Sequence, residues 1–345
     1  MLTPVHTQHG KVAPSDLTPI PIHFVRNGPS YLPELEAYAT FLAARGLRTQ
    51  THDHGDTVPA DAQVVWWICG RVPLAQAWRL RHAFQVHEYT SASVPPHAWL
   101  KDQVKHWTQP RPDYRIFQNG WVRERMGFGH EVPHALRDMG VASHFFDIAQ
   151  PAVQATLPEP EFDLVYLGEM GRLLPFLPVL QSIHDAGRSV LLVGDVPDNV
   201  RTQLPPSVTC TGRVPHAQVP RQLRRARFGL NLVSNIEPYN QQTSTKLLEY
   251  CAVGLPVVSN DYAWVRYFAA HYQGNFHLLR DDPSSWQFSF GEALDAYPYA
   301  VPDVRELAWP KLLDKLAIWK HLHIVPEAPK PSWPIGATSV LRGTR

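Results

Sequence analysis

The sequence has few cysteines, no long apolar run and almost no net charge, and each of these absences excludes a class of protein. Its three cysteines, Cys69, Cys210 and Cys251, lie far apart and lack the paired spacing of a disulfide framework or a zinc site. No stretch of about 18 uncharged apolar residues is present to span a bilayer. Residues 1–21 lack the apolar core of a secretory signal, so we expect a cytoplasmic protein.

The balance of charges also limits the partners that the chain can have. There are 32 basic and 31 acidic residues, a net charge of +1, so no general attraction to nucleic acid is expected. The hydrophobic fraction of 44% is too high for a disordered chain. At about 150 residues per domain, 345 residues predict two domains.

Short apolar runs alternate with helical periodicity along the whole chain, which predicts parallel α/β sheets. The expected strands are 22–25, 64–68, 83–86, 114–117, 164–167, 190–193, 208–210, 228–233 and 256–259. The expected helices include 31–45, 173–186, 219–226 and 246–253. A proline-punctuated stretch near residue 150 separates a first domain, 1–150, from a second, 151–305, and 306–345 forms a terminal helix and a proline-rich tail. Ligands of such sheets bind beyond the carboxyl ends of the strands.

The most informative segment surrounds the expected helix 246–253. Hydroxyl residues, including Ser244 and Thr245, precede its first turn, where they could cap it beside free backbone amides that suit a phosphate. Lys246 lies in that turn, where the helix dipole disfavours a cation unless an anion is bound. Glu249 follows one turn later and could accept hydrogen bonds from ribose hydroxyls. The alternative is an ordinary surface pair between Lys246 and Glu249.

Residues 246–259, with the sequence KLLEYCAVGLPVVS, resemble the C-terminal signature of GT-B glycosyltransferases of the family-4 or group 1 type. Further segments, 164–172, 189–194, 208–213 and 224–232, are similar to the strands and phosphate loop that precede this signature. The resemblance covers about residues 163–262 and implies the GT-B fold, two Rossmann-like domains facing across a cleft.

The resemblance assigns roles in binding a nucleoside-diphosphate sugar. It implies that Glu249 holds the ribose, that Arg172 and Lys246 hold the diphosphate beside Gly168, and that the backbone at Arg213 and Val214 holds the base. The sequence departs from the family at Gln241, where a glutamate is usual, and no lysine follows Arg172 closely. Lys246 is a candidate for the missing cation, and Tyr239 and Glu237 are candidates for sugar contacts.

In the first half, residues 86–91 are similar to the segment where related enzymes place a histidine beside the donor sugar. We therefore expect His87 to orient the sugar and Glu88 to be a candidate base for the acceptor, although a hydrogen-bonded structural histidine is the alternative. Asn27 and Gly28 occupy the place of the family's acceptor loop. The polar run 52–56 is not expected to bind metal, because adjacent side chains in a loop rarely converge on one ion.

Two further segments have amphipathic patterns. In 97–107, Leu100, Val104 and Trp107 lie at helical spacing with Lys101 and Lys105 between them, which fits an ordinary surface helix or a helix that docks on an anionic membrane. The run 307–319 predicts one terminal helix that packs near or across the domain junction.

The resemblance predicts a metal-independent, retaining hexosyltransferase that needs no cofactor beyond its nucleotide-sugar co-substrate. Its acceptor would be a glycan or a lipid-linked glycan, as in bacterial surface-polysaccharide synthesis, and peripheral contact with the inner face of the membrane stays open. The alternatives are a non-catalytic subunit that binds sugar nucleotides and a nucleotide-sugar epimerase.

Overall fold

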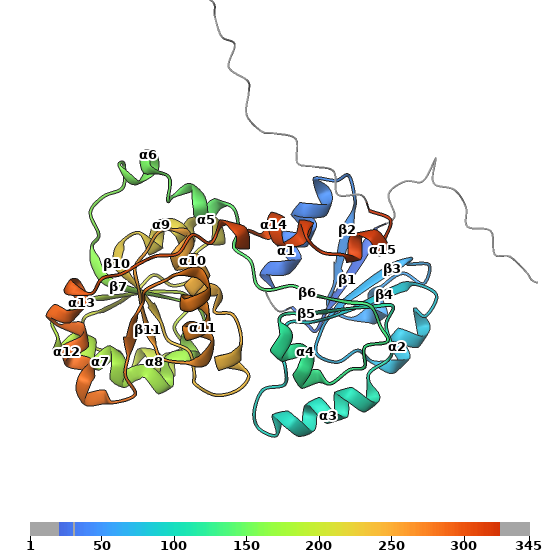
Figure 1. Cartoon of the computed structure of the whole chain (residues 1–345), viewed down its shortest axis with the longest axis horizontal. Helices are drawn as coiled ribbons and strands as arrows, with labels where there is room; N and C mark the ends of the chain where they lie inside the picture. The colour runs from blue at the N-terminus through green and yellow to red at the C-terminus, as the bar shows by residue number, and fades with distance from the viewer. Residues whose placement is uncertain (1–20, 30–31, 325–345) are drawn as a thin grey trace, which may run out of the picture.

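Two parallel sheets of six strands each organise the chain in the computed structural model, which describes residues 21–29 and 32–324 (Figure 1). The first sheet has the order β2-β1-β3-β4-β5-β6. Its strands are β1 (Ile22–Arg26), β2 (Thr49–His52), β3 (Val64–Ile68), β4 (Phe84–Tyr89), β5 (Tyr114–Phe117) and β6 (His134–Leu136). The second sheet has the order β12-β11-β10-β7-β8-β9. Its strands are β7 (Phe162–Leu167), β8 (Val190–Val193), β9 (Val208–Cys210), β10 (Ala226–Asn231), β11 (Val257–Asn260) and β12 (His277–Leu279).

Helices connect successive strands, as parallel pairing requires. In the first domain they are α1 (Pro33–Ala43), η1 (Gly55–Thr57), α2 (Leu74–Arg79), α3 (Ala98–Thr108) and α4 (Gly120–Met126). The link to the second sheet contains α5 (His144–Asp147) and α6 (Pro151–Gln154). The second domain has η2 (Met170–Phe176), α7 (Leu177–Asp185), α8 (Asp198–Arg201), η3 (His216–Gln218), α9 (Val219–Leu223), η4 (Tyr239–Gln241), α10 (Thr245–Ala252), α11 (Ala263–Tyr272), η5 (Pro283–Ser285), α12 (Trp286–Phe290) and α13 (Glu292–Ala296). The described chain ends with η6 (Arg305–Leu307), α14 (Trp309–Asp314) and α15 (Ile318–His321).

The central strands and the edge strand β9 lie where the apolar runs of the sequence predict them, and the other three edge strands do not. The expected strands lie within a few residues of observed ones, because a central parallel strand is buried on both faces and must be apolar throughout. The sequence analysis missed β2, β6 and β12, and each of these lies at an edge of its sheet. The sequence of β2, TQTH, shows why: an edge strand can keep polar side chains facing solvent.

Two expected helices are divided in the structure. The stretch 173–186 begins as the 3-10 helix η2, and α7 starts at Leu177 with a proline in its first turn. The single terminal helix predicted over 307–319 is wrong, because α14 ends at Asp314 and α15 begins at Ile318. The indole N–H of Trp319 donates to the carbonyl of Leu313 at 2.5 Å, so a side chain satisfies a carbonyl at the end of α14.

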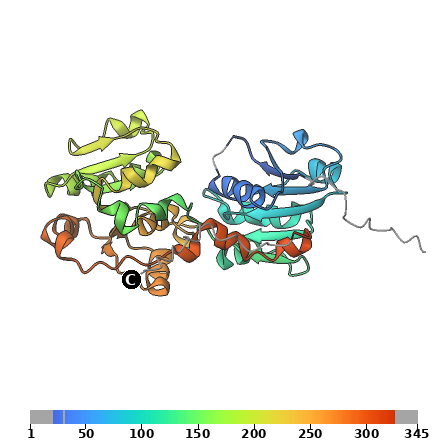
Figure 2. The same cartoon turned by 90° about the horizontal axis from the view of Figure 1, so that it is seen from above.

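The terminal helices return to the first domain, as Figure 2 shows for the red segment of the chain. Trp319 stacks on Phe41 of α1 with ring centroids 5.3 Å apart and lies 5.9 Å from Trp66. Gly140 packs directly against Trp309, where a Cβ atom would lie 2.5 Å from the indole. The helices α14 and α15, which follow the second domain in the sequence, therefore pack against the core of the first domain and link the two domains.

The carboxyl ends of β5 and β6 face the second domain. The side-chain amide of Asn119, just after β5, donates to the carbonyl of Gln241 at 3.0 Å. The hydroxyl of Thr243 donates to Asp138, two residues after β6. These bonds place the segment before α10 against the edge of the first sheet where ligands of α/β folds bind.

Over the described ranges, no helix is long and apolar enough to cross a membrane.

Candidate functional site

A cavity of about 390 Å³ opens at the amino end of α10 in the second domain. Its walls come from η2, the segment after β10, η4 and the first turn of α10. Five residues predicted for donor binding line it, namely Arg172, Tyr239, Ser244, Thr245 and Lys246. The structure also adds lining residues that the predictions had not singled out: Gly171, Leu174, Pro175, Leu232, Val233, Ser234, Gln242 and Thr243.

The hydroxyl groups before α10 do not cap the helix, so that expectation is wrong. Ser244 is the N-cap residue, but its hydroxyl donates instead to Oδ1 of Asn231 at 2.7 Å. Thr243 donates across the domain interface to Asp138. Consequently the backbone amides of Thr245 and Lys246 have no hydrogen-bond partner among the residues that the structure describes. Free amides and the positive end of the helix dipole provide the elements of an anion site.

The ammonium of Lys246 lies in the same place without a carboxylate partner. Its Nζ donates to the hydroxyl of Tyr166 at 2.9 Å and to the carbonyl of Leu232 at 3.1 Å. Burial, and then the positive charge of Arg172, lower the pKa of Lys246 to about 7. In the described chain Lys246 forms no ion pair with Glu249, which removes the surface pair as an explanation of this lysine. A bound anion would offset both effects that lower this pKa.

Arg172 and Gly168 lie around this lysine. The Arg172 guanidinium pairs with Glu169 at 2.9 Å and lies 5.5 Å from the ring centre of Tyr239. Arg172 is 62% exposed, so its side chain can turn toward a ligand. Gly168 has φ +132°, and a Cβ atom there would lie 3.9 Å from Cε of Lys246. The glycine thus allows a backbone conformation that other residues avoid.

The residues predicted for the ribose and base lie to one side of this cavity. The side chain of Glu249 is 17% exposed and its carboxylate lies 3.5 Å from Nε2 of His216. A hydrogen bond from His216 to Glu249 raises the pKa of this histidine. His216 closely follows Arg213 and Val214, which lie in the turn after β9 and do not line the cavity.

A second cavity of about 620 Å³ begins at His216 and runs between the domains. Its walls include His144 and residues of α1 and α14, such as Glu36 and Trp309. The rings of His144 and His216 meet edge to face, with centroids 5.0 Å apart. Because His216 contacts Glu249, this cavity adjoins the residues predicted for ribose and base. Gln241 lines neither cavity, although Gln242 beside it lines the cavity at α10, and its carbonyl accepts a hydrogen bond from Asn119.

The structure corrects the roles expected for His87 and Glu88. Both lie within β4, a central strand covered on both faces, and their exposures are 0% and 1%. Nδ1 of His87 lies 3.2 Å from the Tyr89 hydroxyl, and burial lowers the pKa of this histidine to about 3. It is a neutral core side chain that no sugar can reach in this structure.

Glu88 is likewise a core side chain, held by hydrogen bonds and an ion pair. It accepts hydrogen bonds from the indole of Trp66 at 2.7 Å and the hydroxyl of Tyr38 at 3.1 Å, and it forms an ion pair with Arg137. A carboxylate with these three partners and no solvent contact is not available as a base for an acceptor. The expected strand ended at residue 86, whereas β4 continues to Tyr89, so the sequence did not indicate that both residues lie inside the strand.

The predicted acceptor loop lies at the carboxyl end of β1. Gly28 has φ +75°, and its amide donates to the carbonyl of Asp53 at 3.1 Å. Asn27 is exposed beside it. In the polar run 52–56, His52 bonds to His23 at 3.0 Å rather than to its own neighbours in the run. No group of three metal-binding side chains is present within the described ranges.

Comparison with known proteins bears on the family and the fold of the chain. A family model described as glycosyl transferase-like matches residues 177–282, inside the second domain. No curated protein matches the sequence significantly. Among solved structures, AviGT4, a glycosyltransferase involved in avilamycin A biosynthesis, aligns with a TM-score of 0.55 and 13% identity over 89% of this chain and 97% of that one.

Two further structures align over similar lengths. Anabaena HepE, in complex with UDP and glucose, has a TM-score of 0.55 and 11% identity, with 80% of this chain and 90% of that one covered. Sucrose-phosphate synthase from Thermosynechococcus elongatus has a TM-score of 0.57 and 13% identity, with 86% and 92% covered. Identities this low establish the fold alone, and the family model supports a glycosyltransferase of this type. The chain therefore has the GT-B fold of the glycosyltransferases, and its resemblance to the group 1 family is confirmed within the second domain.

Proposed function

We propose that this protein transfers a sugar from a nucleoside-diphosphate sugar to an acceptor held mainly by the first domain. The observation that carries the proposal is the cavity at the amino end of α10, where free amides and an unpaired, partly buried lysine converge. Anabaena HepE, which shares the fold, holds UDP and glucose in its crystal structure. On this basis the diphosphate lies against Lys246 and the first turn of α10, and the ribose lies toward Glu249.

The chemistry of this site follows from where charge grows. As the bond between sugar and diphosphate breaks, negative charge develops on the leaving phosphate. Lys246, Arg172 and the amides of Thr245 and Lys246 stabilise that charge from fixed positions. Because these groups can supply the positive charge that a metal ion would otherwise provide, we propose a metal-independent reaction with the nucleotide sugar as co-substrate and no separate cofactor.

The absence of a carboxylate at the cavity bears on how the acceptor loses its proton. No aspartate or glutamate is among the described residues that line this cavity, and Gln241 replaces the family's usual glutamate. We therefore assign the acceptor's proton to the leaving phosphate, as the family resemblance implies for retaining enzymes. Transfer of a hexose to a glycan or lipid-linked glycan, as in surface-polysaccharide synthesis, completes the proposal.

The second candidate is a subunit that binds sugar nucleotides without turnover. Gln241 and the buried positions of His87 and Glu88 favour it, because each removes a residue expected at the reacting sugar. An epimerase would need acid and base side chains at the sugar, and the described cavity offers no carboxylate for them. A donor-hydrolysis assay on protein saturated with nucleotide sugar separates the candidates, since slow release of free sugar requires turnover.

Replacing Glu249 with alanine is expected to weaken binding of a ribonucleoside diphosphate by about tenfold, because hydrogen bonds to a charged group contribute roughly 1.5–3 kcal/mol. Isothermal titration with a ribonucleotide and its 2′-deoxy analogue measures the effect. The deoxy analogue should bind wild-type protein more weakly but bind Glu249→Ala as well as the ribonucleotide does. Equal discrimination by both proteins would show that Glu249 does not hold the ribose.

Binding of the nucleotide sugar should weaken as the pH rises above about 7, the pKa of Lys246 without ligand. Only the protonated lysine attracts the diphosphate, so the bound state holds a proton that the free protein loses over this range. The affinity should fall by at most about tenfold per pH unit until the pKa of the complex is reached. A nucleotide sugar is the suitable ligand because its diphosphate is fully ionised at neutral pH. Lys246→Met should give a flatter profile, and a flat wild-type profile would contradict the assignment.

A further inference from the structure

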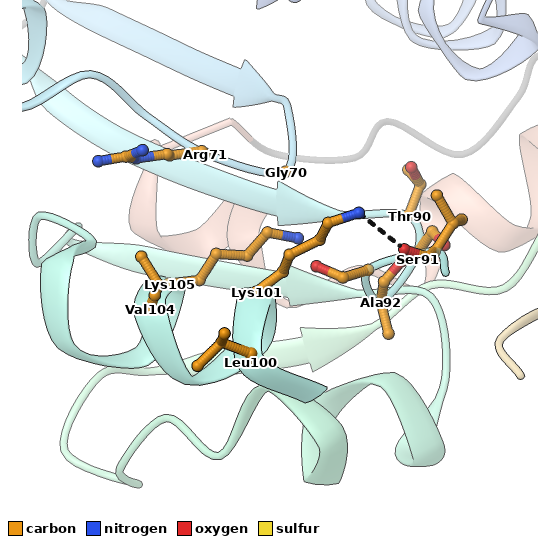
Figure 3. Close-up of a pocket in the computed structure, with 11 residues that line it drawn as sticks. Gly70, Arg71, Thr90, Ser91, Ala92, Leu100, Lys101, Val104 and Lys105 are labelled. Carbon is orange, nitrogen blue, oxygen red and sulfur yellow. Dashed lines mark hydrogen bonds between the residues drawn. The ribbon is translucent and has the colours of Figure 1, made fainter. Parts of the chain in front are cut away.

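A separate pocket of about 600 Å³ lies at the carboxyl ends of β3 and β4 in the first domain (Figure 3). One wall is the segment after β3, with Gly70 and Arg71, and another is the segment after β4, with Thr90 and Ser91. The third wall is the face of α3 that carries Lys101 and other lining residues. The site already described does not use this pocket.

The charges that line this pocket are positive. Figure 3 shows Lys101 and Lys105 extending from α3 toward the ends of the strands, with Arg71 beyond them. The side chain of Arg71 is exposed and makes no hydrogen bond or ion pair with any described residue. Lys101 donates to the carbonyl of Val94 at 3.1 Å, which uses one of its three protons.

The carboxylate nearest to these cations is already occupied. Asp102 is 1% exposed and accepts from the amide of Ser93 at 3.0 Å and from Nε of Arg125 at 3.3 Å. It also lies 3.7 Å from Nζ of Lys105. No acidic residue of the described chain lines the pocket itself, so its three cations have a net positive charge that suits an anion.

An apolar stripe adjoins these cations on the outer face of α3. Leu100, Val104 and Trp107 lie at i, i+4 and i+7 and are 55%, 43% and 79% exposed. Leu100 and Val104 also line the pocket, so the apolar stripe and the cations share one wall. A soluble sugar acceptor would need neither of these features. Cations beside exposed apolar side chains are typical of sites at the surface of an anionic membrane.

The pocket lies on the edge of the sheet that faces the second domain. Asn119 and Asp138, after β5 and β6, contact the loop that leads into α10. Strand β4 is the direct neighbour of β5 in the sheet, about 5 Å away, and β3 follows it. A ligand held at the ends of β3 and β4 therefore extends along this edge toward the proposed donor cavity.

We propose that this pocket binds the phosphate group of a lipid-linked acceptor, whose hydrocarbon chain leaves over Leu100, Val104 and Trp107 into the membrane. The inference rests on the proposed function for its acceptor role, but the binding that it requires can be measured without turnover. Arg71 and Lys101 hold the phosphate, and Lys105, one turn further along α3, adds positive charge to the same pocket. The sugar-accepting end of the lipid head group then points along the sheet edge toward α10.

The test is co-sedimentation of the full chain with vesicles of phosphatidylcholine alone and of phosphatidylcholine mixed with phosphatidic acid. Wild-type protein should bind the mixed vesicles and not the neutral ones. Arg71→Ala and Lys101→Ala should each weaken this binding about fivefold, the usual effect of one cation at such a surface. Trp107→Ala should weaken it about tenfold through lost apolar burial.

The matched control is Arg81→Ala, which removes an exposed arginine of the same domain that lies 4.2 Å from the ring centre of Trp78, away from the pocket. It should bind the mixed vesicles as wild type does. Soluble octyl phosphate, titrated calorimetrically, should lose affinity in Arg71→Ala but not in Trp107→Ala. Equal vesicle binding by wild type, Arg71→Ala and Lys101→Ala would overturn the proposal, as would an equal loss in Arg81→Ala. Binding of octyl phosphate without vesicle binding would overturn the lipid assignment.

Titration of the same variants with nucleotide keeps this test separate from the proposed function. Arg71→Ala and Trp107→Ala should bind nucleoside diphosphate as wild type does, because neither residue lines the donor cavity. Loss of vesicle binding with nucleotide binding intact supports the lipid pocket. Vesicle binding by a wild-type protein that binds no nucleotide would contradict the glycosyltransferase proposal and leave the lipid site standing.

Discussion

Lys246→Met is expected to lower kcat/KM for the nucleotide sugar by about a hundredfold to a thousandfold, the usual effect of removing one preorganised donor to developing charge. The variant keeps the length of the side chain but removes the charge that faces the free amides of α10. Among the described residues, the wild-type ammonium donates only to the Tyr166 hydroxyl and the Leu232 carbonyl, and neither needs a charged donor. The protein should therefore remain folded, and steady-state kinetics at saturating acceptor measure the loss.

The matched control is Lys320→Met, which removes an exposed lysine from α15 on the first domain. Its kcat/KM should equal that of wild type. If Lys246→Met also keeps the wild-type value while remaining folded, the diphosphate does not bind at the amino end of α10.

Glu88→Met is expected to lower the free energy of unfolding by about 3–5 kcal/mol, because it leaves the guanidinium of Arg137 buried without its principal carboxylate. Both side chains of this ion pair are 0% exposed. The substitution also removes the acceptor for the indole of Trp66 and the hydroxyl of Tyr38. Without Glu88 the burial of Arg137 lowers its pKa, but an arginine starts from so high a value that the guanidinium keeps its proton and cannot escape the cost. Chemical denaturation followed by tryptophan fluorescence measures the change.

Glu88→Gln separates this structural role from the catalytic role that the sequence suggested. Glutamine keeps an oxygen for Trp66 and Tyr38 but turns an NH2 group toward Arg137, so it loses the negative charge and the acceptor for the guanidinium. Its stability should still fall less than that of Glu88→Met, which loses all three acceptor contacts. The folded fraction of Glu88→Gln should keep a kcat close to that of wild type. A stable Glu88→Gln protein without activity would instead restore Glu88 as a base.

The predictions of secondary structure were correct where the residues of a single segment are enough to determine its structure. The apolar runs of β3, β5 and β8 are buried on both sides and could be recognised without any partner strand. The proposed anion site at α10 stays a prediction, but it too is local in the sequence, because the consecutive residues Thr245 and Lys246 supply its amides and its cation. Even so, the directions of the Thr243 and Ser244 hydroxyls were not predictable, since their partners Asp138 and Asn231 lie in other parts of the chain.

The errors arose where the role of a residue depends on its distant neighbours. His87 and Glu88 follow an apolar run and could have lain in a loop, but β4 continues to Tyr89 and takes both into the core. The carboxylate of Glu88 is tolerated there because Arg137 comes from a position 49 residues later. The pocket beside α3 likewise depends on the order of the strands, which places Arg71 and Lys101 in the walls of one pocket. No periodicity in the sequence indicates this arrangement.

Calorimetric titration of the wild-type protein with a panel of nucleoside diphosphates at pH 7 tests the central claim most directly. The account predicts that at least one nucleotide binds, that its nucleoside monophosphate binds more weakly, and that Lys246→Met removes most of this difference. If no nucleoside diphosphate binds, or if the second phosphate adds no affinity, the amino end of α10 is not a diphosphate site and the proposed function fails with it.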